Sequence, residues 1–512
     1  MKLTTLLLLF SAPVALLAQH PGDNLFGTDQ IINVDLQFSQ TGFWDSLVAN
    51  YTTETYMKAD VTITDNTGVY SYHDIGIRLK GNSSYGHPGN KKSFKIDFNR
   101  YVDSLDYDKM EKLNFNNAFK DPTFMREKII YDICKKDSIN APRSNYANVY
   151  MNDTFWGFYE VVEQVDDDFL KTHFDESKYN LFKAGDAFTM GGPPESADLK
   201  YYGTDPASYD GKYTLENNTT VNDWSDLIAL TDFINNTTDD VFANELAHHF
   251  NVEQLMKSMV LYNMFANLDS YLNSARNYYI YDKDSSGIWE WINWDCNEAF
   301  GSYSAMGAVT SMPELDLYYY ATDRPLYERI VTIPATKALY EEYYCELRTA
   351  YFNDDYINAA TDALYALIKD AVYADGNKMY TNANFDDNIS SDITTGGGPG
   401  GGTIYGLKSF VTERNTYLDG VLDCQEIVNA VADISVGDIS VYPNPATSYL
   451  VIANLTGSTA ISLVNMNGQQ MMKIDPGPGN TTSVDVSALP AGMYFIRVEN
   501  GNTISTTNFI KQ

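Results

Sequence analysis

Two short segments of this 512-residue chain carry polar side chains that suit a metal and a phosphate. The first contains Asp269, Asn273 and Asn277 and follows an apolar stretch with helical spacing. The second contains Asp295 and follows an apolar stretch with strand character. Hard cations such as Mg²⁺ prefer oxygen ligands from one or two carboxylates together with phosphate oxygens. Either Asp alone is more simply a helix cap or a turn residue, but both in this order favour a metal–phosphate site.

Cations that suit a phosphate lie earlier in the chain. Arg78 and Lys80 belong to the segment R-L-K-G-N-S-S, and Lys92 belongs to K-K-S-F-K-I. Gly and Ser let backbone N–H groups approach an anion, and nearby cations neutralise it. A Gly-Ser loop alone is usually only a turn between strands. A cation cluster inside a chain with a formal charge of -33 is unusual enough to support an anion site.

Composition excludes some functions and leaves others open. The charge of -33 argues against a nucleic-acid binder, which needs a basic face to displace counterions. After the first residues, no apolar run is long enough for a transmembrane segment. Four scattered cysteines form neither a disulfide framework nor a zinc pattern, and their pairing stays open. The carboxylates also leave a glycosidase pair as a third possibility.

Alternating and helical patterns predict the elements that position these residues. Residues 185–225 are rich in Gly, Pro, Ser, Asn and Tyr and fit an insertion or a substrate-facing loop. The tract Gly396 to Gly402 fits a flexible loop. Strands are expected over 31–66, 70–98, 148–162, 278–281 and 288–294, and helices from Asp121-Pro122, from Val252, over 336–374 and over 410–422.

Both ends of the chain carry export signals. Residues 1–18 combine a positive start with a short apolar run and read as a signal peptide. Residues 434–512 have short strands and turns and predict a small all-β sandwich. Its Y-P-N-P and L-P-A-G-M-Y-F-I-R-V segments closely resemble the C-terminal sorting domain of the type IX secretion system. The resemblance implies handling by that machinery, passage through periplasm and outer membrane, and a secreted or cell-surface location.

Five ordered segments of the middle region resemble the CotH kinase family. They are R-L-K-G-N-S-S, K-K-S-F-K-I, D-P-T-F-M-R-E-K-I, N-V-Y-M-N-D-T-F-W-G-F-Y-E-V-V-E-Q-V-D and N-W-D-C-N-E-A-F-G. The resemblance spans roughly residues 30–422. It implies a diverged, two-lobed protein-kinase-like fold that uses ATP with Mg²⁺ or Mn²⁺ to phosphorylate Ser or Thr of exported proteins.

The resemblance implies roles for the acidic and amide side chains. Asp295 is expected to bind the metal, and Asp269 to orient or deprotonate the acceptor hydroxyl. Asn273 or Asn277 is expected to be a second metal ligand, since their spacing from Asp269 does not decide between them. The chain lacks a G-x-G-x-x-G loop and an H-R-D triplet, and Cys296 stands where kinases carry an aromatic residue after the metal-binding Asp.

The resemblance also implies a set of nucleotide contacts. Lys80 or Lys92 is expected to contact the phosphates, with Arg78 nearby. Glu127 is expected to pair with that lysine. Glu163 lies where a strand leaves the first lobe and is expected to contact the nucleotide or the metal.

The sequence thus predicts an α+β protein with a signal peptide (1–18), a CotH kinase-like domain (19–430) and a sorting domain (434–512). The leading hypothesis is a secreted Ser/Thr kinase. The alternative is a non-catalytic surface or matrix protein that retains the fold, because 39 Tyr, the acidity and the sorting domain are also common in adhesins.

Overall fold

A computed structural model describes residues 20–185, 196–283, 287–303, 309–395, 402–424 and most of 440–511. The signal peptide predicted over 1–18 lies outside these residues, as does most of the glycine tract. The chain divides into two compact units, Met1–Val421 and Leu422–Gln512. Within the described ranges, no helix is both long and apolar enough to cross a membrane.

Seven of the described strands close into a barrel in the order β1-β2-β3-β4-β5-β7-β6. Neighbours pair antiparallel except β1 and β6, which run parallel and complete the closure. The predicted alternation is confirmed in the first strand, where Ile32, Val34 and Leu36 are buried in the barrel core. The strands are β1 (Ile31–Gln37), β2 (Met57–Thr64), β3 (Val69–Leu79), β4 (Phe94–Asp97), β5 (Lys112–Asn116), β6 (Ser144–Met151) and β7 (Thr154–Glu163).

The prediction of strands over 31–66 is wrong in its middle, where helix α2 (Phe43–Ala49) joins β1 to β2. Gly42 adopts a left-handed conformation (φ 69°) that turns the chain into this helix. The ring of Phe43 stacks on Phe38 with centroids 4.5 Å apart, and Leu47 is buried. Tertiary packing of these apolar side chains therefore overrides the local strand pattern. Two further short helices are α1 (Asp23–Phe26) and α3 (Ser83–Gly86).

Helix α4 (Arg126–Lys136) packs beside the barrel and begins later than predicted. Asp121 still satisfies its first turn, because its carboxylate accepts a hydrogen bond from the backbone N of Arg126 at 2.8 Å. The backbone cannot be helical earlier, since Phe124 is left-handed (φ 56°). The predicted buried face is confirmed at Ile129, Ile130 and Ile133.

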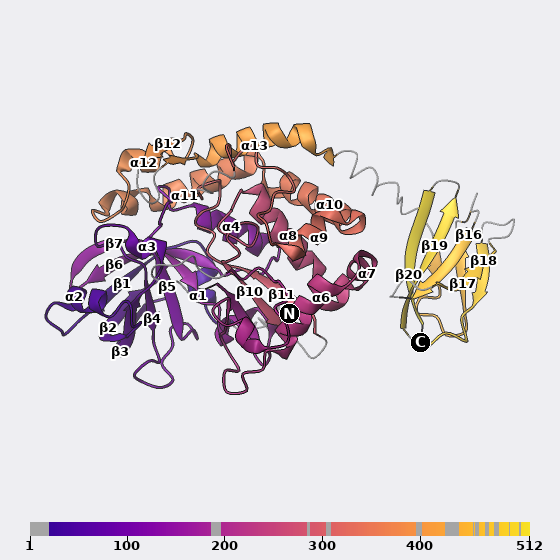
Figure 1. Ribbon diagram of the computed structural model, residues 1–512, viewed down its shortest axis with the longest axis horizontal. Coiled ribbons are helices and arrows are strands. Elements are labelled where there is room, and N and C mark those ends of the chain that lie inside the picture. Colours follow the sequence, from indigo (N-terminus) through magenta and orange to yellow (C-terminus); the bar gives the residue numbers. More distant parts are fainter. Residues whose placement is uncertain are drawn as a thin grey trace, which may run out of the picture. The chain divides into compact units, whose positions relative to one another are not determined.

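The rest of the first unit is a four-stranded sheet, in the order β11-β10-β8-β9, with helices around it. Figure 1 shows the barrel and helices α8 to α10 on different sides of this unit. The strands are β8 (Leu181–Ala184), β9 (Tyr213–Leu215), β10 (Tyr278–Asp282) and β11 (Trp289–Asn293). The helices are α5 (Asp167–Phe174), α6 (Ser225–Asn236), α7 (Asp239–His249), α8 (Val252–Met264), α9 (Pro325–Thr332), α10 (Pro334–Tyr351), α11 (Asp354–Ala374), α12 (Asn382–Asp387) and α13 (Leu407–Val421).

Smaller elements complete this unit. The region predicted as an insertion, 185–225, contains β9 and the 3₁₀ turn η1 (Pro206–Ser208), and residues 186–195 of it lie outside the described ranges. A two-stranded sheet of β12 (Ile393–Thr395) and β13 (Gly402–Ile404) precedes α13. In this unit Cys345 is disulfide-bonded, and Cys134 and Cys296 are buried free thiols.

The second unit is all β, as the sequence predicts. One sheet has the order β14-β15-β18 and the other β17-β16-β19-β20. Apolar side chains of both sheets, such as Leu450, Ile452 and Ile496, share one buried cluster. The strands are β14 (Ser440–Tyr442), β15 (Tyr449–Ala453), β16 (Ala460–Asn465), β17 (Gln470–Ile474), β18 (Thr481–Asp485), β19 (Gly492–Asn500) and β20 (Thr503–Lys511). The protein therefore joins a mixed helix-and-sheet unit to a small β unit.

Candidate active site

The pairing of β10 with β11 brings the two predicted carboxylates together. Tyr278, the first residue of β10, pairs with Asn293, the last residue of β11. The loop before β10 and the loop after β11 therefore meet at one end of the sheet. Asp269 lies in the first loop. The side-chain amide of Asn277 donates to the backbone O of Asp269 (2.7 Å) and to Oδ2 of the same residue (3.1 Å). Asp295 lies in the second loop with a left-handed backbone (φ 54°).

On the barrel side, Lys80 and Glu127 are joined by an asparagine. Lys80 directly follows β3, and its Nζ donates to Oδ1 of Asn114 (3.1 Å) and Oδ1 of Asn116 (3.0 Å), both on β5. Nδ2 of Asn116 in turn donates to Oε2 of Glu127 at 2.8 Å. Of the two candidate lysines, Lys80 is thus the one linked to Glu127, through the Asn116 amide.

Helix α4 links this bridge to Asp295. Tyr131, one turn after Glu127, donates its hydroxyl to Oε1 of Glu127 (2.9 Å) and accepts from the backbone N of Asp295 (3.0 Å). Oε1 of Glu127 also accepts from the backbone N of Cys296 at 3.2 Å. One connected network therefore holds Lys80, Glu127 and Asp295. We call Lys80, Asn116, Glu127, Tyr131 and Asp295 the central network.

The charges of this network are perturbed by burial and by one another. Burial lowers the pKa of Lys80 to about 8, although Asp295 and Glu127 oppose the shift. Burial, followed by repulsion from Glu127 and Asp269, raises the pKa of Asp295 to about 7. Burial also raises the pKa of Glu127. Carboxylates that repel one another in a poorly solvated site are stabilised by an added cation, so this end of the sheet suits a positively charged ligand.

Further lysines lie beside Lys80 and were not predicted. Burial, then repulsion by Lys80, Arg78 and Lys183, lowers the pKa of Lys95 to about 7. Lys95 belongs to β4 and Lys183 to β8, which pairs with β10 at Tyr279. Cations from the barrel and from the second sheet therefore meet at Lys80. Strand alternation carried a signal for Lys95, which lies between the buried Phe94 and Ile96.

Three other predicted residues bond to groups outside the central network, although Arg78 still repels Lys80 and Lys95. Nζ of Lys92 donates to the backbone carbonyls of Tyr85 and His87. Arg78 forms an ion pair with Glu54 at 3.0 Å. Oδ1 of Asn273 accepts from the hydroxyl of Tyr319 at 3.0 Å. Within the described residues the hydrogen bonds of Asp269 come from Asn277 and not from Asn273, so Asn277 is the amide held at that carboxylate.

Glu163 is held in a buried ion cluster at the end of β7. Its Oε2 accepts from Nε (3.0 Å) and backbone N (3.1 Å) of Arg143 and contacts Nε2 of His173 (3.2 Å), while its Oε1 pairs with the Arg143 guanidinium. Burial acts against ionisation, but Arg143 and His173 outweigh it and lower the pKa of Glu163 to about 2. Both oxygens are thus already bonded to protein groups.

An ion pair that was not predicted lies on the Asp269 side of the site. Nζ of Lys120 is 2.8 Å from Oε2 of Glu298, and both side chains are largely buried. Burial and repulsion by Asp269 raise the pKa of Glu298 to about 8, although Lys120 opposes the shift and Asp295 adds to it. Glu298 belongs to the segment N-W-D-C-N-E-A-F-G, and its position three residues after Asp295 was the sequence signal that could have identified it as a site residue.

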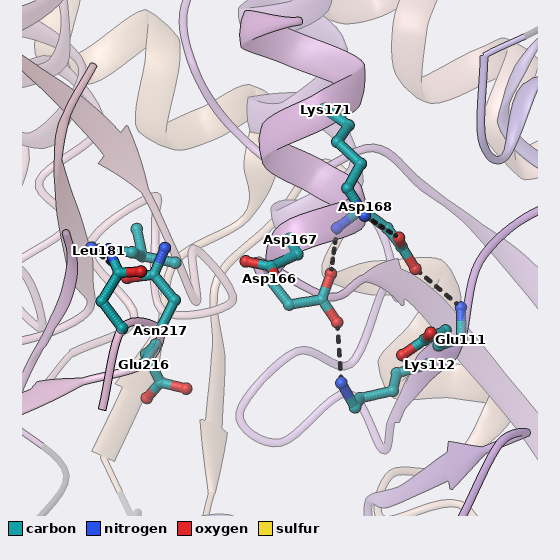
Figure 2. Close-up of a pocket in the computed structure, with 10 residues that line it drawn as sticks. Glu111, Lys112, Asp166, Asp167, Asp168, Lys171, Leu181, Glu216 and Asn217 are labelled. Atoms are coloured by element: carbon teal, nitrogen blue, oxygen red, sulfur yellow. Dashed lines mark hydrogen bonds and ion pairs between the residues drawn. The ribbon is translucent and has the colours of Figure 1, made fainter. Parts of the chain in front are cut away.

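A cavity of about 250 Å³ lies between α5 and β9. Figure 2 shows Asp166, Asp168, Glu111 and Lys112 on one side of it, with Glu216 and Asn217 facing them. Lys112 pairs with Asp166 at 3.3 Å, and burial raises the pKa of Asp166 to about 6. Glu216 is also among the charges that act on Lys95, so the cavity adjoins the lysines around Lys80. Its excess of carboxylates disfavours phosphate but suits hydroxyl groups that donate hydrogen bonds.

The side chains of the site can supply oxygen ligands to a divalent metal. Across the described ranges, no group of three or more His, Cys, Asp or Glu side chains is arranged to hold a metal by itself. Mg²⁺ needs no such cage, since it commonly takes one or two carboxylates together with phosphate oxygens and water. Asp295 fits this mode, because the two charges that act on it most strongly, Glu127 and Asp269, both repel its carboxylate. The residues present therefore fit a metal that arrives with a phosphate ligand.

Sequence and structure comparisons assign similarities to both units. The CotH kinase protein family matches residues 77–418, and the secretion system C-terminal sorting domain matches residues 440–512. Inner spore coat protein H of Bacillus subtilis (strain 168) is 23% identical over 239 residues, which cover 44% of this chain and 59% of that protein. This chain thus spans less than two thirds of that relative's length. The twitchin kinase region from C. elegans aligns at 8% identity over 89% of this chain and 87% of that chain, with a TM-score of 0.18, too low to bear on the fold.

Proposed function

Because the chain belongs to the CotH kinase protein family, we propose that it is a kinase that transfers the γ-phosphate of ATP to Ser or Thr of exported proteins. The chain also carries a secretion sorting domain, so it is itself exported, to the cell surface or beyond it. In this proposal the barrel and the helical part act as the two lobes of a diverged protein-kinase-like fold. The central network supports the proposal most directly, since it joins a lysine, a glutamate and an aspartate from three separate elements.

Each charged group of the site has a part in binding MgATP. Lys80, with Lys95 and Lys183 nearby, supplies positive charge for the phosphates. Asp295 would hold the metal, which would lower the charge on the phosphates, and Asn277 is the better-placed candidate for the second metal ligand. The acidic cavity accepts the uncharged end of the nucleotide, where carboxylates such as Asp166 take hydrogen bonds from ribose hydroxyls.

The transfer step is a displacement at phosphorus. The hydroxyl oxygen of the acceptor Ser or Thr attacks the γ-phosphorus as the bond from that phosphorus to the β–γ bridging oxygen breaks. The acceptor proton passes to Asp269, whose carboxylate Asn277 orients through Oδ2. ADP leaves with the bond electrons. Glu127 contributes by holding Lys80, through Asn116, and the backbone after Asp295 in fixed positions.

The proposal is tested with purified full-length protein, labelled ATP and Mg²⁺ or Mn²⁺. We expect metal-dependent autophosphorylation or phosphorylation of an exported acceptor, and its loss in Asp295→Ala and Asp269→Asn. Phosphosites are mapped by mass spectrometry to check that they are Ser or Thr. Transfer that does not need a metal, or that survives Asp295→Ala, contradicts the proposal. A thermal shift by ATP without transfer favours the non-catalytic alternative.

A further inference from the structure

A lysine on the turn between β5 and α4 reaches the Asp269 side of the site. Its ammonium, Nζ of Lys120, is 2.8 Å from Oε2 of Glu298, with the lysine side chain 13% and the glutamate 6% exposed. The same ammonium lies 5.3 Å from the centroid of the Tyr303 ring. Lys80 approaches from the barrel by way of β3, so the two lysines come from different elements.

The backbone around Lys120 is tied to the loop that follows Asp295. Nδ2 of Asn297 donates to the backbone O of Phe119 at 3.0 Å, and Oγ of Ser302 donates to the backbone O of Lys120 at 2.9 Å. Lys120 itself has a left-handed backbone (φ 58°). These contacts hold the backbone of Lys120 in place and so fix the direction from which its side chain reaches Glu298.

Charges around the pair place it next to Asp269. Asp269 is the charge that acts most strongly on Glu298, ahead of Lys120 and Asp295. Asp269 is likewise the charge that acts most strongly on Tyr303, the ring beside Lys120. The segment from Asn267 to Asn277 contains one cation, Arg276, which also acts on Tyr303, and no lysine. Lys120 therefore supplies an ammonium group beside the carboxylate that receives the acceptor proton in the proposed reaction.

There is room for a ligand group at this ammonium. A cavity of about 120 Å³ is lined by Lys120, Ser302, Tyr303, Thr310 and Tyr405, among other residues. A phosphoryl group in transit spreads negative charge over its three equatorial oxygens and is stabilised by cations placed before the reaction.

We propose that Lys120 is a catalytic residue that binds the phosphoryl group during its transfer, and that Glu298 positions the lysine by its ion pair. This rests on the proposed function. Lys80 neutralises the nucleotide phosphates in the ground state, whereas Lys120 acts from the acceptor side as the charge moves toward the Ser or Thr oxygen.

The test compares Lys120→Met, Lys120→Arg and Lys337→Met in the full-length protein. Lys337, on α10, is the control, because it too pairs with a glutamate and lies beside a tyrosine ring. Its Nζ is 3.8 Å from Glu341 and 4.2 Å from the Tyr318 ring centroid. We expect Lys120→Met to lower kcat by about 100-fold with KM for ATP changed less than about twofold. Lys120→Arg restores part of kcat because it keeps the charge, and Lys337→Met has wild-type kinetics.

A second readout does not need an acceptor. Thermal shifts are measured with MgADP alone and with MgADP plus aluminium fluoride, which imitates the phosphoryl group in transit. Lys120→Met is expected to keep the MgADP shift and to lose the additional shift from aluminium fluoride. An equal additional shift in Lys120→Met and Lys337→Met overturns the role of Lys120 while leaving the kinase proposal standing. A wild-type protein with no shift from any of these nucleotides overturns both.

Discussion

The Glu163→Gln substitution distinguishes two roles of this carboxylate. It either stabilises the fold through its ion pairs or contacts the nucleotide, as the family resemblance implies. Glu163 is 3% exposed, and both of its oxygens are bonded to Arg143 or His173. Gln keeps the shape but removes the charge, so the Arg143 guanidinium loses its main counter-charge. We therefore expect a loss of stability and an unchanged thermal shift by MgATP.

The size of the effect follows from the pKa. Burial opposes ionisation, yet Arg143 and His173 bring the pKa of Glu163 from 4.5 down to about 2. At about 1.4 kcal/mol per tenfold change in proton affinity, this shift corresponds to roughly 3 kcal/mol of folding stability. Because the folded-state pKa is lowered, the contribution is complete above the unfolded-state pKa. It is lost progressively as the pH falls from 4.5 toward about 2.

The assay is urea unfolding of both proteins at pH 7 and at pH 3. We expect Glu163→Gln to lower the free energy of unfolding by roughly 3 kcal/mol at pH 7 and by clearly less at pH 3. The control is Glu245→Gln, which removes an exposed pair with His248 and should cost less than about 1 kcal/mol. Equal stability at pH 7, a difference independent of pH, or a lost MgATP shift would refute the reasoning.

Three further predictions concern buried groups of the first unit. Lys91→Met leaves the fully buried Asp375 without its cation and should cost about 3–5 kcal/mol in urea unfolding. Gly157→Ala places a methyl group 2.7 Å from Nζ of Lys91 and 2.9 Å from the Asp375 carboxylate. We expect it to lower the free energy of unfolding by about 1–3 kcal/mol. The control is Gly86→Ala, whose methyl group meets no neighbour within 4 Å. Burial and repulsion by Glu127 raise the pKa of Glu160. The folded protein therefore binds a proton that the unfolded chain releases, and its free energy of unfolding falls as the pH rises above the unfolded-state pKa. Between pH 5 and pH 7 we expect Glu160→Gln to gain stability relative to wild type by up to about 1.4 kcal/mol per pH unit. A constant difference across that range would contradict the last prediction.

Local patterns predicted much of the fold. Alternation located β1, and helical spacing located α8 and the buried face of α4. The parallel pairing of β1 with β6 could not be predicted, because it joins Ile31 to Tyr146, far apart in the sequence. Helix α2 was missed since its stability comes from packing of Phe43 and Leu47 and not from a local signal.

The sequence likewise predicted some features of the candidate site and could not predict others. The order of Asp269 and Asp295 around β10 and β11 was readable, because paired neighbouring strands bring their flanking loops together. The bonding of Glu163 to Arg143 was not readable, since strand position gives no sign of which charge a buried carboxylate will meet. The pair of Lys120 and Glu298 joins residues 178 positions apart and becomes visible only in three dimensions.

The most direct test of the central claim is a crystal structure of the full-length protein with Mn²⁺ and a non-hydrolysable ATP analogue. We predict an anomalous manganese peak at the carboxylate of Asp295 and phosphate oxygens within hydrogen-bond distance of Nζ of Lys80. Nucleotide bound away from Lys80, or manganese bound away from Asp295, would contradict the claim that the central network is a metal–nucleotide site.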